Sequence, residues 1–204
     1  MGTEEEVIVP LRAPSAAAIA PLTHVRSTLV SASLMAMTSR GLSDAYFAKL
    51  PPALHATVRT LVAGAWVPLE IAQAHYQAVD ALGLSAQDAF AIGGEVGDRV
   101  QASLLGVVFR LAKGTGATPW SAIRMYPRLW DRVFQGGDNR VVSLGPKEAR
   151  IENYGVGLCR YQYFRNAWRG LVCTGMSLFC RKAFVHEVVA QTTSTKFVFR
   201  ASWA

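Results

Sequence analysis

The spacing of hydrophobic residues changes along the chain, and this change constrains the fold more than any other feature. As far as residue 133, apolar side chains recur every three or four residues in runs separated by glycine and proline, which predicts helices. After the segment QGGDN, the stretches RVVSLG and EARIENYG alternate apolar and polar residues as strands do. Residues 158–180 return to helical spacing, and AFVHEVVA and KFVFRASW predict two closing strands.

This order predicts an α+β fold. An N-terminal helical half packs on a C-terminal antiparallel sheet, and an amphipathic helix is inserted between two strand pairs (strand–strand–helix–strand–strand). The sheet is expected to be antiparallel because short loops join the strands of each pair. We expect a single domain over residues 23–204. Residues 1–22 are acidic and then rich in proline, alanine and serine, which predicts an arm that is flexible or docked through a short strand at VIV.

Caps and breaks divide the helical half. Ser85 is expected to cap a long helix over residues 86–114. Gly93, Gly94 and Gly97 interrupt this helix and together predict a bend or close packing against another element. Thr118 is expected to cap the next helix. Leu54, Val58, Leu61 and Val62 have the spacing of one buried helix face. The segment AWVP is then expected to be a break before a helix that starts at Pro68.

Composition excludes several classes of protein. The chain has 204 residues, and none of its segments has about 18 uninterrupted apolar residues, so no membrane span is expected. The N-terminus lacks the positive start and apolar core of a secretory signal, and three widely spaced cysteines fit free thiols in a reducing compartment. We therefore expect a cytoplasmic protein. The net charge of +7 permits an anionic partner without indicating one.

The residues that carry chemistry do not form a catalytic or metal-binding pattern. Cys159, Cys173 and Cys180 are too far apart for a zinc site, whose cysteine pairs are normally two to four residues apart, and their spacing is typical of core thiols. The four histidines form no paired motif. We expect no enzyme activity and no metal. His75 lies in a predicted helix and is kept as a haem ligand in an alternative hypothesis only.

Arginines recur at helical spacing. Arg124, Arg128 and Arg132 follow one another every four residues on one predicted helix face. Such a face is typical of the solvated side of an amphipathic helix. Binding of nucleic acid or another anionic surface through these arginines is the alternative that we keep open.

Several segments carry a resemblance to known proteins. These are VRSTLVSASLMAM, LPPALHATVRTLVAGAWVPLEIAQAHYQAV, GLSAQDAFAIGGEVGDR, YPRLWDRVFQGGDNRVVSLGPKEARIENYG and the closing KFVFRASW. Over residues 22–203 the chain resembles an uncharacterised myxobacterial-type family of about this length. That family is related to the ligand-binding fold shared by the 4-vinyl-reductase-like domain, the haem nitric-oxide-binding domain and the TRAPP vesicle-tethering subunits. The Tyr-x-Ser-x-Arg propionate clamp of the haem branch is missing from this sequence.

The resemblance implies helices on one face of an antiparallel sheet, often as a dimer, with room between them for haem or a small apolar ligand. We expect Tyr161, Phe164, Trp168 and Cys173 to face the interior and to line a pocket together with Trp130.

The sequence thus predicts a non-enzymatic binding, regulatory or scaffold module with an apolar small-molecule pocket or a dimer interface. No cofactor is expected, and the expected partners are a second copy of the chain or another protein. Haem or gas sensing and nucleic-acid binding are the alternatives.

Overall fold

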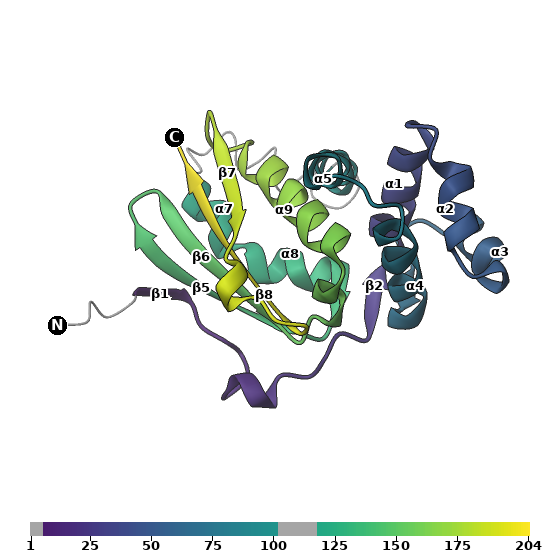
Figure 1. Ribbon diagram of the computed structural model, residues 1–204. Helices are drawn as coiled ribbons and strands as arrows, with labels where there is room; N and C mark the ends of the chain where they lie inside the picture. Colours follow the sequence, from purple (N-terminus) through teal and green to yellow (C-terminus); the bar gives the residue numbers. More distant parts are fainter. Residues whose placement is uncertain (1–5, 102–117) are drawn as a thin grey trace.

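The computed structural model describes residues 6–101 and 118–204 and has helices on one face of an antiparallel sheet (Figure 1). The sheet contains five strands in the order β1-β5-β6-β8-β7. They are β1 (Glu6–Val9), β5 (Asp138–Gly145), β6 (Glu148–Tyr154), β7 (Ala183–Glu187) and β8 (Lys196–Trp203). The α+β fold and the strand–strand–helix–strand–strand order are therefore confirmed, and β1 is added at one edge by pairing with β5.

The register of the central strands explains which face of the sheet is covered. Val141, Ile151 and Phe199 lie next to one another across β5, β6 and β8, and all three are buried. Because side chains alternate between the two faces of a strand, the neighbouring Arg140 and Glu152 point to the opposite face. The apolar residues of the alternating pattern thus form the floor on which the helices pack.

The described residues also contain eight α-helices. They are α1 (Ser27–Thr38), α2 (Ser43–Lys49), α3 (His55–Arg59), α4 (Leu69–Asp80), α5 (Ala86–Val100), α7 (Pro119–Arg124), α8 (Tyr126–Val133) and α9 (Gln162–Met176). Helix α9 lies between the sheet and α5, while α1 to α4 extend away from the sheet (Figure 1). The Ser85 side chain caps α5 by accepting a hydrogen bond from the Asp88 amide, as expected.

Helix α9 also covers the outer edge of the sheet. The Arg169 guanidinium donates through Nε and Nη2 to the carbonyl oxygen of Val185 in β7, at 3.1 and 3.0 Å. The Cys173 thiol lies 3.4 Å from the carbonyl oxygen of Ala183, two residues earlier in the same strand. These side chains cover carbonyl groups that an edge strand would otherwise expose.

The structure corrects three expectations for the helical half. The segment AWVP is not only a break, because it contains strand β3 (Trp66–Pro68). This strand pairs with β2 (His24–Arg26), and β2 also pairs with β4 (Phe134–Gln135). The predicted helix after residue 53 is only the short α3, and Val62 is 73% exposed instead of buried. The apolar spacing of that segment continues past the point where the chain leaves the helix to form β3.

The region around Pro127 divides the predicted helix in two. Thr118 caps the start of α7, as expected, and forms a capping box with Ser121; the helix ends at Arg124. Helix α8 starts at Tyr126, so that Pro127 lies in its first turn, where its missing amide costs nothing. The part of the predicted helix 86–114 that follows residue 101 lies outside the described residues.

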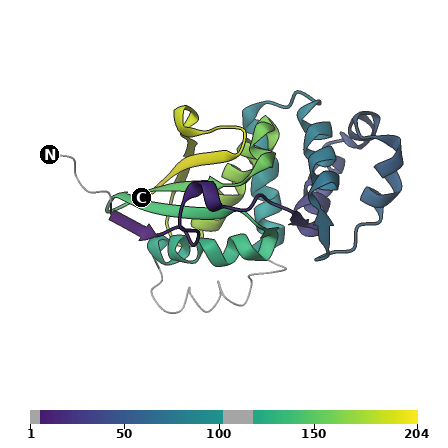
Figure 2. The ribbon, with the colours of Figure 1, turned by 90° about the horizontal axis from the view of Figure 1, so that it is seen from below.

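The N-terminal arm follows the sheet on its way to β2 (Figure 2). The Arg12 guanidinium bonds Asp131 and Asp138, and the Leu22 amide donates to the carbonyl oxygen of Gly155. Gly155 has a φ of +73°, which favours glycine over other residues. Within the described ranges, no helix combines the length and apolar character needed to cross a bilayer.

Candidate functional site

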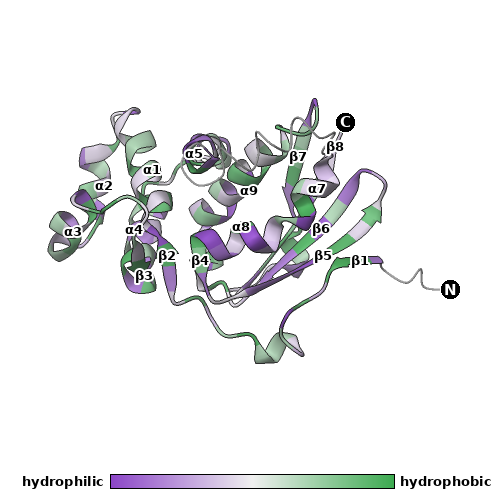
Figure 3. Ribbon diagram, turned by 180° about the vertical axis from the view of Figure 1, so that it is seen from behind, coloured by the Kyte–Doolittle hydropathy of each residue, from purple (hydrophilic) through white to green (hydrophobic). Residues whose placement is uncertain are grey.

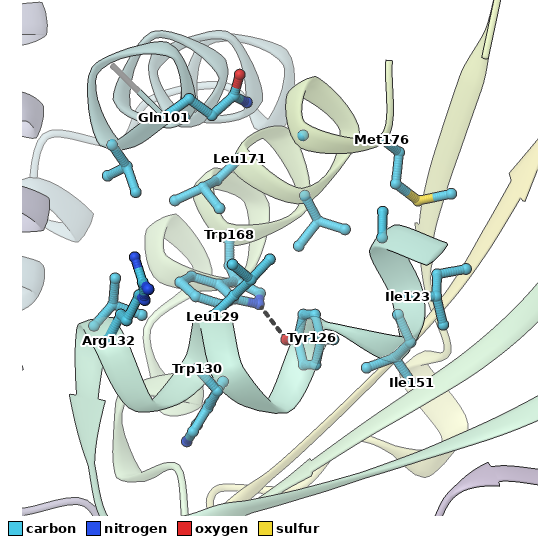
Figure 4. A pocket seen from close by; sticks show the side chains of 16 residues that line it. Gln101, Ile123, Tyr126, Leu129, Trp130, Arg132, Ile151, Trp168, Leu171 and Met176 are labelled. Carbon is cyan, nitrogen blue, oxygen red and sulfur yellow. Dashed lines mark hydrogen bonds between the residues drawn. The ribbon is translucent and has the colours of Figure 1, made fainter. Parts of the chain in front are cut away.

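A cavity of about 80 Å³ lies between α5, α7, α8, α9 and β6 (Figure 4). Hydrophobic side chains form most of its wall. The lining residues are Gly97, Val100, Gln101, Ala122, Ile123, Tyr126, Leu129, Trp130, Arg132, Val133, Ile151, Trp168, Leu171, Val172, Gly175 and Met176. An apolar cavity with few polar groups is typical of a small-molecule site.

The polar atoms of the aromatic residues in this wall are bonded within the protein. The indole Nε1 of Trp168 donates to the Tyr126 hydroxyl at 3.0 Å, and that hydroxyl donates to Oδ1 of Asn153 at 2.9 Å. Burial raises the pKa of the Tyr126 hydroxyl above its ordinary value. Trp130 donates to the carbonyl oxygen of Gly136 at 3.1 Å. A ligand beside these aromatic residues therefore meets ring faces rather than free donors, while Gln101 and Arg132 add polar groups to the wall.

The structure brings together two of the five pocket residues expected from the sequence. Trp130 and Trp168 both line the cavity, with ring centroids 5.6 Å apart and nearly perpendicular planes. Phe164 is buried and stacks on Trp168 at 6.0 Å, but it does not line the cavity.

The other two expected residues lie elsewhere. Cys173 faces β7 and not the cavity, because it shares its helix stripe with Arg169, four residues earlier. Tyr161 precedes the first turn of α9 and is half-buried outside the cavity. Sequence reasoning did not select Tyr126, although it precedes Trp130 by four residues and so falls on the same helix face.

His75 is buried in the helical half, and both of its ring nitrogens are engaged. Nδ1 lies 2.9 Å from the Tyr46 hydroxyl and Nε2 lies 3.1 Å from the Ser33 hydroxyl, which in turn lies 2.6 Å from the Tyr163 hydroxyl. Burial lowers the pKa of His75 to about 3. Neither nitrogen has a lone pair directed at a cavity, so the structure does not place His75 as a metal ligand.

The three arginines of the alternative hypothesis do not share one helix. Arg124 ends α7, while Arg128 and Arg132 belong to α8, and all three are exposed. The ribbon of α8 carries strongly hydrophilic segments (Figure 3). Arg132 also lies at the apolar cavity (Figure 4).

Among the described residues, no group of histidine, cysteine, aspartate and glutamate side chains could hold a metal ion. Cys159 is buried, and burial raises the pKa of its thiol to about 11. Burial also raises the pKa values of Cys173 and Cys180. A raised thiol pKa lowers the fraction of reactive thiolate at neutral pH.

Comparison with known proteins gives a likeness of fold. No family model matches the chain, and no curated protein matches it. Among solved structures, an Fe(II) unliganded mutant of an H-NOX (haem-nitric oxide/oxygen binding) protein from K. algicida has a TM-score of 0.62 at 10% identity, over 88% of this chain and 96% of that chain. An oxygen-binding H-NOX domain related to soluble guanylate cyclases, in its oxygen complex, has a TM-score of 0.55 at 10% identity, over 87% and 94%.

The chain therefore has an H-NOX-like fold. This agrees with the haem nitric-oxide-binding branch of the sequence resemblance at the level of fold. The myxobacterial-type family and the TRAPP and 4-vinyl-reductase-like relatives stay predictions.

The residues of the cavity do not fit haem. Protein side chains that hold haem iron are histidine, cysteine, methionine and tyrosine. No histidine or cysteine is among the described lining residues, and the Tyr126 hydroxyl is already bonded on both sides. Met176 is the one remaining candidate in the described wall, and the cavity is smaller than the roughly 300–1,000 Å³ of typical ligand pockets.

Proposed function

We propose that the chain is a non-enzymatic binding module of the sensor type, which holds a small apolar molecule in the cavity between α5, α8, α9 and β6. The observation that carries this proposal is the wall itself, in which Trp130 and Trp168 present their rings while their N–H groups are bonded elsewhere. Such a wall favours apolar ligands, because a polar ligand would lose its hydrogen bonds to water without replacement.

The volume limits the class of ligand. An apolar cavity of about 150 Å³ in another protein binds benzene or xenon. The cavity of about 80 Å³ suits molecules no larger than benzene, or one apolar end of a longer molecule. The absence of acid–base chemistry in the described wall supports a binding role, since its ionisable side chains are Tyr126, with a raised pKa, and Arg132.

Fluorescence of the wall residues offers a direct test. We expect xenon, which quenches tryptophan by contact, to reduce emission saturably, and benzene to raise the melting temperature. A ligand at 100 times its Kd stabilises a protein by about 2.7 kcal/mol. Val172→Phe, which fills the cavity, is expected to abolish both effects. Val189→Phe is the matched control, because Val189 is exposed outside the cavity.

The proposal fails if neither probe has a saturable effect on the unmodified protein, or if Val172→Phe responds as the control does. A fold check by circular dichroism accompanies both variants, because overpacking a core costs about 1–3 kcal/mol.

Haem-based gas sensing is the second candidate, and the likeness to H-NOX structures is the observation that favours it. The wall residues argue against it. An absorption spectrum of the purified protein, with and without added hemin, separates the candidates. A Soret band that survives gel filtration would favour haem and displace the first proposal. A second copy of the chain or another protein stays a predicted partner, which native mass spectrometry tests.

A further inference from the structure

A second cavity of about 190 Å³ lies where the end of α4 and the start of α5 meet the first turn of α9. Its described wall differs from that of the apolar cavity because it contains a carboxylate, which lies together with a buried amide residue. Asp80 and Asn166 supply these groups, while Val79 and Leu84 supply apolar surface.

One carboxylate oxygen of Asp80 accepts a hydrogen bond from a described residue, and the other does not. Its Oδ1 accepts a hydrogen bond from the Tyr163 amide at 2.7 Å, so the carboxylate caps the N-terminus of α9. Oδ2 accepts no hydrogen bond from any described residue, and no described basic side chain forms an ion pair with Asp80. The wall thus presents a negative charge that has no cation beside it.

Asn166 supplies a donor that is also without a partner. Its residue is 6% exposed, and its Oδ1 accepts a hydrogen bond from Nη1 of Arg169 at 3.0 Å. A guanidinium can only donate, so this bond fixes the orientation of the amide and leaves Nδ2 as the other atom. In the described part of the chain, nothing accepts from Nδ2. Nδ2 is not one of the fully buried atoms of the described residues, so it is open to the cavity, where a ligand oxygen can replace water as its acceptor.

The wall has two further polar residues, namely Gln162, which is exposed, and Tyr163, whose hydroxyl is not available. The Tyr163 hydroxyl lies 2.6 Å from the Ser33 hydroxyl, within the buried chain that leads to His75. Tyr163 therefore contributes its ring and its amide, which Asp80 already binds.

We propose that this cavity binds a small organic cation, namely a primary ammonium group that carries a neutral oxygen acceptor on a short carbon chain. The ammonium donates to Oδ2 of Asp80, the oxygen accepts from Nδ2 of Asn166, and the short carbon chain packs on Val79 and Leu84. The size agrees, because a cavity of about 150 Å³ already holds a molecule of six carbon atoms. The carboxylate excludes anions.

Ethanolamine is the probe, and three small molecules are its controls. n-Propylamine lacks the oxygen, n-propanol lacks the charge, and acetate has the opposite charge. In ¹⁵N-labelled protein we expect ethanolamine to shift the Tyr163 amide and the Asn166 side-chain amide saturably. n-Propylamine should bind more weakly, and acetate should shift neither signal. No saturable shift with ethanolamine, or equal shifts with acetate, would overturn the proposal.

Two variants test the assigned groups. Asp80→Asn keeps an oxygen for the Tyr163 amide but removes the charge, and is expected to weaken ethanolamine binding by about tenfold or more. Asp98→Asn is the matched control, because it removes the same charge from an exposed position of α5 and should leave the affinity unchanged. Asn166→Asp keeps the Arg169 contact and replaces the donor with an acceptor, so 2-methoxyethylamine, the ethanolamine analogue whose oxygen can only accept, should lose its advantage over n-propylamine. Unchanged affinity in Asp80→Asn, or unchanged preference in Asn166→Asp, contradicts the assignment.

Discussion

Gly93 of α5 lies directly against the backbone of Ala167 in α9. A β-carbon added at Gly93 would stand 1.9 Å from the Ala167 carbonyl oxygen, and one added at Gly170 would stand 2.0 Å from that of Phe90. Helices α5 and α9 thus each place a glycine against the backbone of the other helix. This contact fixes the separation of α5 and α9, and both helices contribute wall residues to the apolar cavity.

Gly93→Ala is expected to destabilise the protein by about 3 kcal/mol or more, because backbone on a neighbouring helix cannot yield as a side chain can. Chemical denaturation measures the change. Gly175→Ala is the control in α9, since among the described residues its β-carbon would meet only the Gln101 side chain, at 3.8 Å. That substitution should be neutral, or stabilising by about 0.5–1 kcal/mol through helix propensity. Equal stability of the two variants would contradict the backbone contact.

The buried His75 predicts a loss of stability in mild acid. Its pKa is lowered to about 3 in the folded protein, while an unfolded chain protonates histidine near pH 6.5. Between these values the unfolded state binds the extra proton, so the free energy of unfolding should fall by about 1.4 kcal/mol for each pH unit below about 6.5.

Urea denaturation of His75→Gln between pH 7 and pH 5 tests this dependence. The variant is expected to be less stable at pH 7 because its contacts to Ser33 and Tyr46 change, but its stability should vary less with pH. Tyr46→Phe removes one contact and keeps the histidine, so it should retain the steep dependence. If the dependence is as steep in His75→Gln as in the unmodified protein, another group is responsible.

Much of the fold follows from the sequence because the deciding signals are local. The alternation of apolar and polar residues predicted the paired strands β5–β6 and β7–β8, and the capping residues Ser85 and Thr118 predicted where two helices start. The expected helix after residue 53 was mostly wrong, since its apolar spacing is a local pattern while β3 forms only by pairing with the distant β2. Local spacing carries no information about that pairing.

The apolar cavity was less predictable, because its wall comes from segments far apart in the sequence. Trp130 and Trp168 could be selected as large aromatic residues at helical spacing, and both line it. Cys173 could not be placed correctly, since the sequence alone does not say which side of α9 faces β7. That side is the stripe of Arg165, Arg169 and Cys173, whose side chains contact β7.

The three thiols are expected to react at different rates. Cys159 is buried with its pKa raised to about 11, while Cys173 and Cys180 are half-buried. A pKa of about 11 reduces the thiolate fraction of Cys159 by about a hundredfold relative to an ordinary thiol, and the thiolate is the reactive form. Burial raises the pKa values of Cys173 and Cys180 as well, so their greater exposure is what favours their faster labelling. Iodoacetamide labelling of native protein at pH 8, followed by peptide mass spectrometry, should modify Cys159 last. Early labelling of Cys159 would show that its burial is not maintained in solution.

The Tyr126 hydroxyl links α9 to the sheet, since it accepts from Trp168 and donates to Asn153. Tyr126→Phe would leave a buried N–H and a buried amide oxygen without this partner, which is expected to cost about 1–3 kcal/mol. Tyr161→Phe is the matched control, because Tyr161 is half-buried and its hydroxyl has no described partner. Denaturation should separate the two variants, and the Trp168 emission should change only in Tyr126→Phe. Equal stability would mean that the ring of Tyr126, and not its hydroxyl, supports the cavity wall.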